Sequence, residues 1–359
     1  MKKIKIFLLF IMVVLVGGCS CSNEECKCPN DSTTTENHET VVINDYSELY
    51  KQTVQSVVMI RVQKKNDKSS VLATGSGVVA YQVENRAYVY TNAHVVKGVT
   101  TEYEVEIIFS DENGFPSGES QVVNSNYVYK DLYEDVAVIE IRASSKYKLA
   151  TLADSDKLER GDWIYTIGSP LSKFNYTTSG NVSSTRVPIG LDSSKTGVNT
   201  TVYAIMFDAA INEGNSGGAL FNSKGELVGI TTLKYDEVYG MYGALPINFF
   251  DVVAKYLMVN DSNYVRPALN IELLSIDEMG SRKGQYGISD YITSGAYILS
   301  SREASISAQN IITAVNGKTI KSAADFVIEL LKYNVGNKIT ITTVDKDNLS
   351  IKTVEVTLH

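Results

Sequence analysis

The chain contains the stretch Asp208-Ala-Ala-Ile-Asn-Glu-Gly-Asn-Ser216-Gly-Gly-Ala-Leu-Phe221, a turn of small residues between two apolar runs with one serine near its tip. A hydroxyl is a poor nucleophile at neutral pH, so a catalytic serine needs a base to accept its proton and donors to hold the developing oxyanion. The flanking glycines let the backbone turn tightly, which would direct the N–H groups of Gly214 and Ser216 toward one point. The same residue types form ordinary turns, so the stretch alone also fits a simple loop between strands.

One histidine is available as the base. The sequence has 3 histidines, of which His38 lies in a polar N-terminal segment and His359 is the last residue. His94 remains, at the end of the apolar run Ala87-Tyr-Val-Tyr-Thr-Asn-Ala-His94-Val-Val. A histidine at the end of a strand is often structural, so a catalytic role for His94 depends on its partners.

A catalytic histidine also needs a buried carboxylate that fixes its tautomer and stabilises the imidazolium. Asp135 is the best candidate, because it directly precedes the apolar run Val136-Ala-Val-Ile, where a carboxylate can be held away from water. Asp131 and Glu134 are nearby in the polar segment 130–134, and we expect both to be solvated. Taken alone, Asp135 also fits a turn residue that starts a strand.

The region around these residues predicts an all-β fold. Short β-branched and aromatic runs divided by turn residues are typical of a barrel or sandwich. The runs are 57–62, 77–83, 87–91, 103–109, 136–141, 163–167, 178–183, 203–208 and 227–232. Gly75-Ser-Gly77-Val-Val-Ala80 superficially matches a dinucleotide-binding fingerprint, but a β-branched strand follows it instead of a helix, so we reject that interpretation.

Helices are expected at both ends of this region. Segment 46–55 fits a short helix, in which Tyr46 and its apolar neighbours either pack on the core or form an oligomer contact. Segment 246–258 includes an amphipathic run that would form a closing helix. After a short linker at 260–263, a second unit contains strands, a hairpin-type turn at Val315-Asn-Gly317 and a helix at 322–332.

Three motifs in order now point to one family. The order His94, Asp135, Ser216 is the chymotrypsin-type order. The surrounding segments Thr91-Asn-Ala-His94-Val-Val, Asp135-Val-Ala-Val-Ile and Asn212-Glu-Gly-Asn-Ser216-Gly-Gly-Ala-Leu resemble the three signatures of HtrA (Deg) family serine proteases. Further similarity lies in Gly75-Ser-Gly77, Ile167-Gly-Ser-Pro170, Ser179-Gly-Asn-Val-Ser183 and Gly229-Ile-Thr, so the resemblance covers most of 57–246.

This resemblance implies a chymotrypsin-like double β-barrel followed by a small α+β PDZ-like domain. It also implies ATP-independent endoproteolysis of unfolded or damaged envelope proteins, usually by homotrimers, with no metal or other cofactor. Ser216 would attack the peptide carbonyl, His94 would carry the proton, Asp135 would orient His94, and the Gly214 and Ser216 N–H groups would form the oxyanion hole.

Positions around the serine bear on specificity and regulation. Ala210 occupies the position at the base of trypsin-like S1 pockets, which predicts small or branched aliphatic side chains at P1. Asn215 replaces the aspartate that trypsin-like zymogens use for activation, so activation through a freed N-terminus is not expected. Glu213 stands where the family usually has a proline and adds a charge beside the oxyanion loop.

The C-terminal unit resembles a PDZ domain. Arg266-Pro-Ala-Leu-Asn-Ile271 is similar to the entry of the family's PDZ domain, which places a carboxylate-binding loop at Leu269, Asn270 and Ile271. Asn310-Ile-Ile-Thr-Ala-Val-Asn-Gly-Lys-Thr-Ile320 is similar to its central strand and turn. PDZ domains bind a peptide C-terminus as an added strand. Asn270 replaces the usual glycine, so peptide capture and a merely structural or regulatory role both stay open.

The N-terminus predicts export. Three lysines within the first five residues precede an apolar core at 6–16, and Val16-Gly-Gly-Cys19 resembles a bacterial lipobox in which Cys19 is acylated. An uncleaved anchor helix is the alternative, and either places the protein outside the cytoplasm, tied to the cell membrane.

All 4 cysteines lie within 19–28, in a spacing that fits no zinc pattern. The net charge of -8 argues against nucleic-acid binding.

The predicted organisation is therefore a signal peptide at 1–18, a disordered tether at 19–45, a protease domain at 46–260 and a PDZ-like domain at 264–359. The predicted function is a membrane-tethered extracytoplasmic serine endopeptidase. One alternative is a non-catalytic chaperone or adaptor that binds unfolded chains through an inactive protease fold. Another is an esterase with the same triad, although the chain lacks the Gly-x-Ser-x-Gly elbow between a strand and a helix that such enzymes use.

Overall fold

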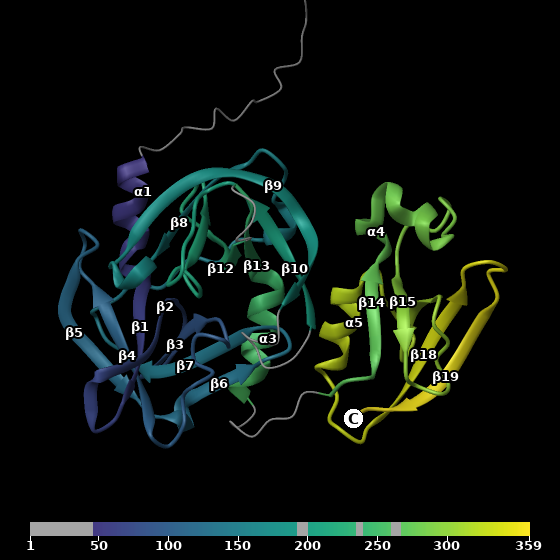
Figure 1. Cartoon of the computed structure of the whole chain (residues 1–359), viewed down its shortest axis with the longest axis horizontal. Coiled ribbons are helices and arrows are strands. Elements are labelled where there is room, and N and C mark those ends of the chain that lie inside the picture. The colour runs from purple at the N-terminus through teal and green to yellow at the C-terminus, as the bar shows by residue number, and fades with distance from the viewer. Residues whose placement is uncertain (1–45, 192–199, 235–239, 260–266) are drawn as a thin grey trace, which may run out of the picture. The chain divides into compact units, whose positions relative to one another are not determined.

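Figure 1 shows the computed structural model, which describes residues 46–191, 200–234, 240–259 and 267–359. The predicted signal peptide, the tether with Cys19, Cys21, Cys26 and Cys28, and the linker 260–263 lie outside the described residues. Among the described residues, no helix combines the length and the apolar character needed to cross a membrane.

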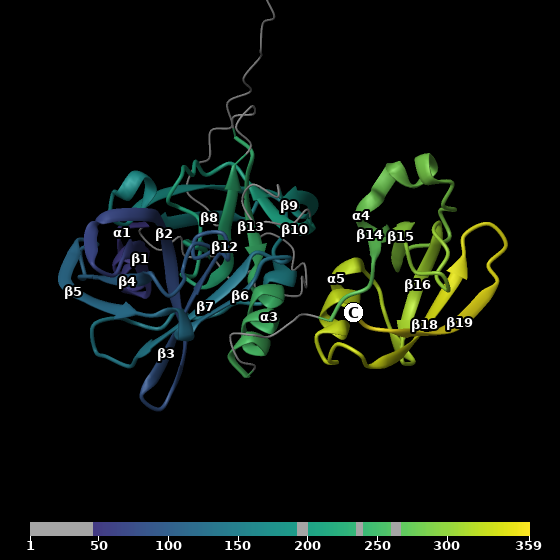
Figure 2. The same ribbon diagram turned by 60° about the horizontal axis from the view of Figure 1, so that its bottom comes forward.

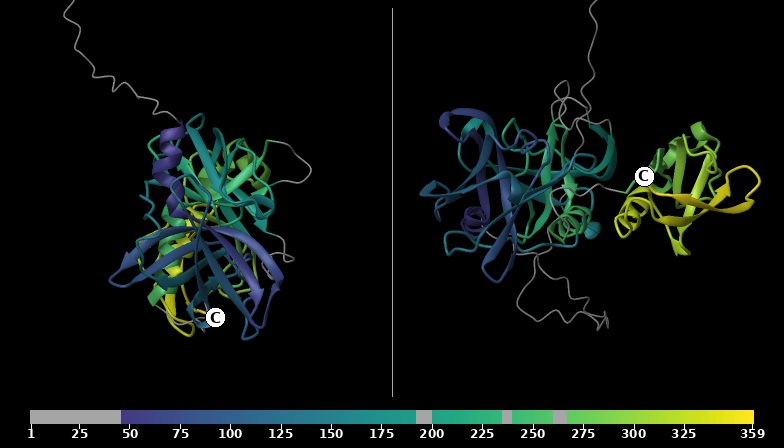
Figure 3. Two further views of the ribbon diagram at one scale, coloured as in Figure 1. Left: turned by 90° about the vertical axis from the view of Figure 1, so that its left-hand side faces the viewer. Right: turned by 90° about the horizontal axis from the view of Figure 1, so that it is seen from below.

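The first half of the region before the linker is a seven-stranded antiparallel sheet in the order β5-β4-β1-β2-β3-β7-β6. Its strands are β1 (Val57–Lys64), β2 (Asp67–Val83), β3 (Arg86–Thr91), β4 (Tyr103–Ser110), β5 (Pro116–Val123), β6 (Val128–Asp131) and β7 (Val136–Arg142). The sheet is strongly twisted (Figure 3, left). Its ladder does not close, but the Gln121 side chain on β5 bonds the backbone N–H and C=O of Arg142 at 2.9 Å each, which draws β5 and β7 together.

The second half is a closed barrel in the order β10-β13-β12-β11-β8-β9. Its strands are β8 (Trp163–Gly168), β9 (Tyr176–Leu191), β10 (Thr200–Phe207), β11 (Ala219–Asn222), β12 (Leu227–Lys234) and β13 (Tyr242–Pro246). The predicted runs all lie in strands, except that Asp208 is one residue beyond the end of β10, whereas β5, β6, β11 and β13 were not predicted. Strand β5 is largely exposed and polar, and the other three have four or five residues, which is too short for a clear pattern.

Strand β7 shows how the two halves share a core. Val136 and Val138 on one face join a cluster that also contains barrel residues such as Tyr165 and Phe221. Ala137 and every second residue after it along β7 face the interior of the first sheet. A strand buried on both faces reads as a continuous apolar run, which explains the Val-Ala-Val-Ile pattern.

Helices cover this shared core at two places. Helix α1 (Tyr46–Thr53) places Tyr46 edge-on against Trp163 and Tyr165, with ring centroids 5.5 Å apart in both pairs, so core packing accounts for its aromatic surface. Helix α3 (Ile247–Val259) packs against β6, β7 and β12 (Figures 1 and 2). Short 3-10 helices are η1 (Val54–Ser56), η2 (Ser125–Tyr127), η3 (Ser155–Lys157) and η4 (Pro170–Ser172).

The C-terminal region forms its own sheet in the order β14-β15-β16-β18-β19, with β17 paired to β16. Its elements are β14 (Ile271–Ser275), α4 (Ile276–Met279), η5 (Gly280–Tyr286), β15 (Ala296–Ser301), β16 (Asn310–Val315), β17 (Lys318–Thr319), α5 (Ala323–Leu330), β18 (Lys338–Asp345) and β19 (Ile351–Thr357). The predicted turn is confirmed, since Asn316 and Gly317 have φ values of 46° and 77°. Ser322 caps α5 by accepting from the Asp325 N–H.

Candidate active site

The structure brings His94 and Asp135 into direct contact. His94 follows β3 and Asp135 precedes β7, two neighbouring strands of the first sheet. The His94 Nδ1 atom lies 3.0 Å from Oδ1 and 2.9 Å from Oδ2 of Asp135. The Asp135 side chain is 1% exposed and that of His94 16% exposed. A buried carboxylate on Nδ1 leaves the other ring nitrogen free to act as a base toward the solvent side.

The backbone of Asp135 is held in a sparsely populated conformation. Its φ is +56°, which aspartate tolerates better than most residues. The Asp135 carbonyl accepts from Asn92 Nδ2 at 3.1 Å and from the Ala93 N–H at 3.2 Å, and the His94 N–H donates to Oδ1 at 3.0 Å. These bonds fix both the backbone and the carboxylate of Asp135. The strained backbone therefore lies at the residue that orients the imidazole of His94.

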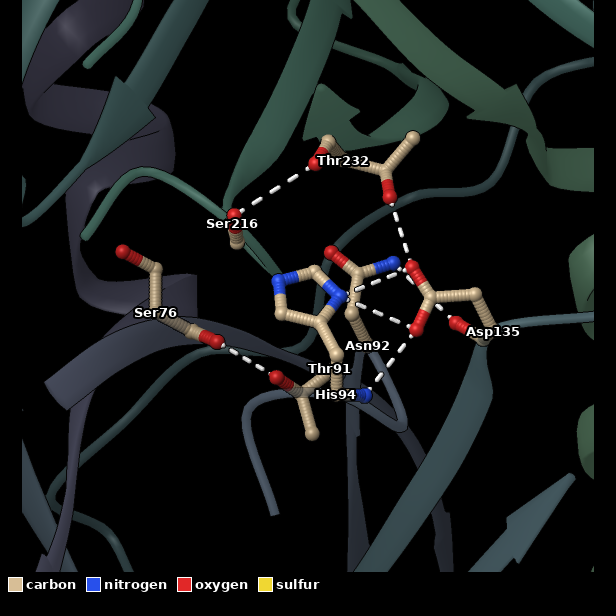
Figure 4. A network of polar contacts seen from close by, with 7 residues as sticks. All are labelled: Ser76, Thr91, Asn92, His94, Asp135, Ser216 and Thr232. Atoms are coloured by element: carbon tan, nitrogen blue, oxygen red, sulfur yellow. Dashed lines mark hydrogen bonds and ion pairs between the residues drawn. The ribbon is translucent and has the colours of Figure 1, made fainter. Parts of the chain in front are cut away.

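Thr232 on β12 completes the surroundings of this carboxylate. Its Oγ1 donates to Asp135 Oδ2 at 2.7 Å, and the residue is 2% exposed. The sequence analysis did not select Thr232, although it adjoins the Gly229-Ile-Thr segment. The bond crosses from the barrel to the first sheet, which ties the two halves together at the site (Figure 4).

The expectation that Asp131 and Glu134 are solvated was wrong. Both are 5% exposed. Asp131 ends strand β6, and its Oδ1 accepts from the backbone N–H groups of Tyr133 and Glu134 at 2.9 and 3.2 Å. The carboxylate of Asp131 therefore stabilises the turn that leads into Asp135, whereas Asp135 is the carboxylate that contacts the imidazole.

Ser216 lies beside the imidazole on the side opposite Asp135 (Figure 4). Its hydroxyl donates to the carbonyl oxygen of Thr232 at 3.5 Å, which is a long hydrogen bond. Hydrogen bonds between a catalytic serine and histidine are often long or poorly aligned without substrate and tighten only when substrate binds.

The loop that precedes Ser216 has its carbonyl groups fixed by hydrogen bonds. The Glu213 carbonyl accepts from the Leu171 N–H at 2.8 Å. The Asn215 carbonyl accepts from Thr231 Oγ1 at 2.6 Å and from the Gly218 N–H at 2.8 Å. A trans peptide directs its N–H opposite to its C=O, so these bonds turn the N–H groups of Gly214 and Ser216 to the other side. Within the described ranges, neither N–H has a hydrogen-bond acceptor.

The unusual residues in this loop fit the structure. The side chain of Glu213 is exposed, so water solvates its charge. Asn215 is buried, and its Oδ1 lies so close to Gly168 that a Cβ there would approach it to 2.6 Å. Ala210 is exposed, and its carbonyl accepts from Thr178 Oγ1 at 2.8 Å.

No group of three or more His, Cys, Asp or Glu side chains among the described residues is arranged to hold a metal ion.

The predicted carboxylate-binding loop of the C-terminal unit already contains a carboxylate of this chain. The Asn270 N–H donates to Oε1 of Glu303 at 2.9 Å, and the Ile271 N–H donates to the Leu269 carbonyl at 2.9 Å. His359 Nε2 lies 3.5 Å from the same Glu303 oxygen. Two of the three N–H groups that the sequence assigned to a peptide carboxylate are therefore engaged internally.

Comparison with known proteins agrees with this geometry. Residues 75–230 match the model of the trypsin-like peptidase domain. The serine protease Do-like HtrA of Lactococcus lactis subsp. cremoris is 31% identical over 294 residues, which cover 77% of this chain and 69% of that protein. The chain belongs to the HtrA family of serine proteases. It is accordingly a serine endopeptidase with a trypsin-like fold.

Other HtrA proteins share the same level of similarity. Serine protease Do-like HtrB of Bacillus subtilis is 31% identical over 299 residues, covering 79% of this chain and 61% of that protein. Periplasmic serine endoprotease DegP of Escherichia coli is 31% identical over 281 residues, covering 75% and 54%. The fold is similar to that of the HtrA-type protease AlgW with tripeptide, with a TM-score of 0.61 at 22% identity, over 88% of this chain and 96% of that one.

Proposed function

We propose that this HtrA protease uses Ser216 as nucleophile, His94 as general base and Asp135 as the residue that orients His94, and that it degrades unfolded polypeptides outside the cytoplasm. The contact that carries the assignment is the one between His94 Nδ1 and both carboxylate oxygens of buried Asp135. It leaves the Ser216 side of the imidazole available for proton transfer (Figure 4).

The reaction follows from the positions of these groups. Ser216 Oγ attacks the peptide carbonyl carbon and passes its proton to His94, whose positive charge the Asp135 carboxylate stabilises. The carbonyl oxygen gains negative charge and accepts hydrogen bonds from the N–H groups of Gly214 and Ser216. His94 then protonates the leaving amine, and water releases the acyl group by the same steps in reverse.

Ala210 supports a preference for small aliphatic side chains at P1. Its methyl group offers no charge to a lysine or arginine of the substrate and leaves room for alanine or valine. The Glu213 side chain is exposed beside the loop and does not occupy the position of Ala210 at the base of the pocket. Its charge therefore does not replace that of a pocket carboxylate.

The cellular setting of the proposal comes from the sequence. The lipobox-like segment at Cys19 supports a lipid anchor on the extracytoplasmic face of the cell membrane, followed by a tether at 19–45. Similarity to HtrA proteases supports unfolded or misfolded proteins as substrates and a homotrimer as the working form. The PDZ-like unit, proposed at 264–359, would take a C-terminal peptide only if its carboxylate-binding loop is freed from Glu303.

The test compares the wild type with Ser216→Ala on an unfolded protein and on the same protein folded. We expect loss of about a millionfold in kcat in the variant, because nucleophile and base act as a unit. Mass spectrometry of the products should find small aliphatic residues at P1. Equal cleavage by both enzymes would refute the assignment of Ser216, and cleavage mainly after lysine or arginine would refute the role of Ala210.

A further inference from the structure

Ser76 lies at the point where the first sheet meets the loop of the nucleophile. It is in β2 and is fully buried. Its N–H donates to the Ser216 carbonyl at 2.8 Å, and its carbonyl accepts from Thr91 Oγ1 at 2.7 Å. A Cβ at Gly75 would lie 2.6 Å from Val95 and 3.2 Å from the Ser216 carbonyl oxygen, so a glycine is needed for this close approach. The Gly75-Ser-Gly77 motif thus has a packing reason that is unrelated to nucleotides.

The Ser76 hydroxyl connects two loops that the mechanism needs. Its Oγ donates to the carbonyl oxygen of Gly214 at 2.7 Å. The same Oγ accepts from the N–H of Ser169 at 2.8 Å. A serine hydroxyl has one proton to donate and two lone pairs, so these bonds use its only proton and one lone pair. Ser169 is also fully buried, and its N–H would lose this acceptor if the hydroxyl were removed.

The first bond fixes the torsions of Gly214. The peptide before Gly214 is held by the bond from the Leu171 N–H to the Glu213 carbonyl, and the peptide after it by Ser76 Oγ. Gly214 has a φ of +95°, and glycine can leave that conformation at little cost. With both neighbouring carbonyl groups held, the Gly214 N–H keeps the direction that an oxyanion requires.

The second bond supports the loop that supplies Leu171. Leu171 and Ser172 have φ values of +51° and +59°, which are unfavourable for residues other than glycine. Strain of this kind persists only where surrounding contacts hold it. The bond from Ser169 to Ser76 Oγ anchors the start of this strained segment, and Leu171 in turn holds the Glu213 carbonyl.

We propose that Ser76 is a positioning residue whose hydroxyl holds the oxyanion hole in its productive form from both sides. It does not touch the substrate, and it acts through Gly214 and through the 169–171 segment. The role rests on the proposed assignment of Ser216 as the nucleophile. It predicts that removing the hydroxyl weakens stabilisation of the transition state more than binding of the ground state.

The expected effect is a fall in kcat with little change in KM. Removal of an oxyanion-hole donor costs about 10²–10³ in kcat, and because Ser76→Ala leaves both donors in place, we expect about 10- to 100-fold. Ser76→Cys keeps a weak donor at the same position and should recover part of this loss. Ser56→Ala is the matched control, since the Ser56 hydroxyl is equally buried and donates to the Thr53 carbonyl at 2.6 Å, away from the nucleophile loop.

The experiment measures the full-length protein and its variants in two assays. The first gives kcat and KM on an unfolded protein, together with inhibition by a peptide boronate, which forms a tetrahedral adduct, and by a product peptide. The second gives the rate of labelling by a fluorophosphonate, which needs no peptide recognition. In that reaction Ser216 Oγ bonds phosphorus, fluoride leaves, and the hydroxyl proton passes to His94.

Support consists of parallel losses of kcat, boronate affinity and labelling rate in Ser76→Ala, with product-peptide affinity kept and Ser56→Ala active. Wild-type labelling rates in Ser76→Ala would overturn the proposal, as would an equal loss of product-peptide affinity or an equal loss of kcat in Ser56→Ala. If the wild type and Ser216→Ala label equally, the proposed nucleophile is wrong and the role of Ser76 falls with it. If the wild type labels and Ser216→Ala does not, Ser76 is judged on its own.

Discussion

Replacing Gly214 with alanine separates two properties of the oxyanion loop, its backbone conformation and its close packing. A Cβ at Gly214 would lie 2.5 Å from the Ser169 carbonyl oxygen, 3.0 Å from the Leu171 nitrogen and 3.1 Å from the Pro170 Cα. All are backbone atoms, so no side-chain rotation can relieve the overlap. The φ of +95° adds strain of about 1–2 kcal/mol for any residue with a Cβ.

The chain contains a matched control for the strain alone. Gly161 has a φ of +92°, almost the same as Gly214, and a Cβ there would meet no heavy atom within 4 Å. Gly161→Ala should therefore cost only the conformational term, about 1–2 kcal/mol of unfolding free energy, and keep its kcat. Gly214→Ala should cost this term and about 1–3 kcal/mol more for the overlap, with kcat reduced at least about 100-fold as the loop shifts.

Urea denaturation gives the two unfolding free energies, and cleavage of one unfolded substrate gives the two kcat values. The difference between the variants reports the packing term, because the conformational terms are nearly equal. If Gly214→Ala kept kcat within threefold of the wild type, the oxyanion would not depend on this backbone, and the proposed hole would be refuted.

Two further predictions concern carboxylates. Thr232→Val keeps the side-chain shape but removes the 2.7 Å hydrogen bond to Asp135 Oδ2, and because a bond to a charged group contributes about 1.5–3 kcal/mol, we expect kcat to fall about tenfold or more. Wild-type kinetics in this variant would show that the two bonds to His94 suffice. Glu303→Ala frees the Asn270 N–H, so isothermal calorimetry should find about tenfold tighter binding of a peptide with a free C-terminal carboxylate than in the wild type. An amidated peptide is the control, and unchanged affinity for the free acid would argue against a peptide-binding role of this loop.

The sequence was sufficient to select candidate site residues where few residues of the same type compete for the role. The histidine count left His94 as the candidate base, and the apolar run after Asp135 placed that carboxylate at the start of a buried strand, where the structure has it. The same approach failed for Asp131 and Glu134, because their polarity and position in a polar segment predicted exposure. Their burial depends on the turn that Asp131 stabilises through two backbone N–H groups, a feature that composition does not reveal.

The residues that sequence reasoning missed act across long separations. Thr232 bonds a carboxylate 97 residues away, and Ser76 bonds a carbonyl 138 residues away. A threonine or serine in a strand is common and has no distinguishing pattern, so its partner appears only once the barrel and the first sheet are assembled. The fold of the strand-rich halves was predictable from their apolar runs, whereas short strands such as β11 and the polar strand β5 were not.

The long sequence separations between the bonded residues of the site determine when this protease becomes active during folding. Contacts between distant parts of a chain form late, because the entropy of closing a long loop must be paid first. His94 and Asp135 can meet within the first sheet, but the bonds from Thr232 and to Gly214 require the barrel. A chain whose barrel has not yet formed therefore has no complete site. Newly made molecules are unable to cleave one another while they are still unfolded, which is the state in which they most resemble the proposed substrate.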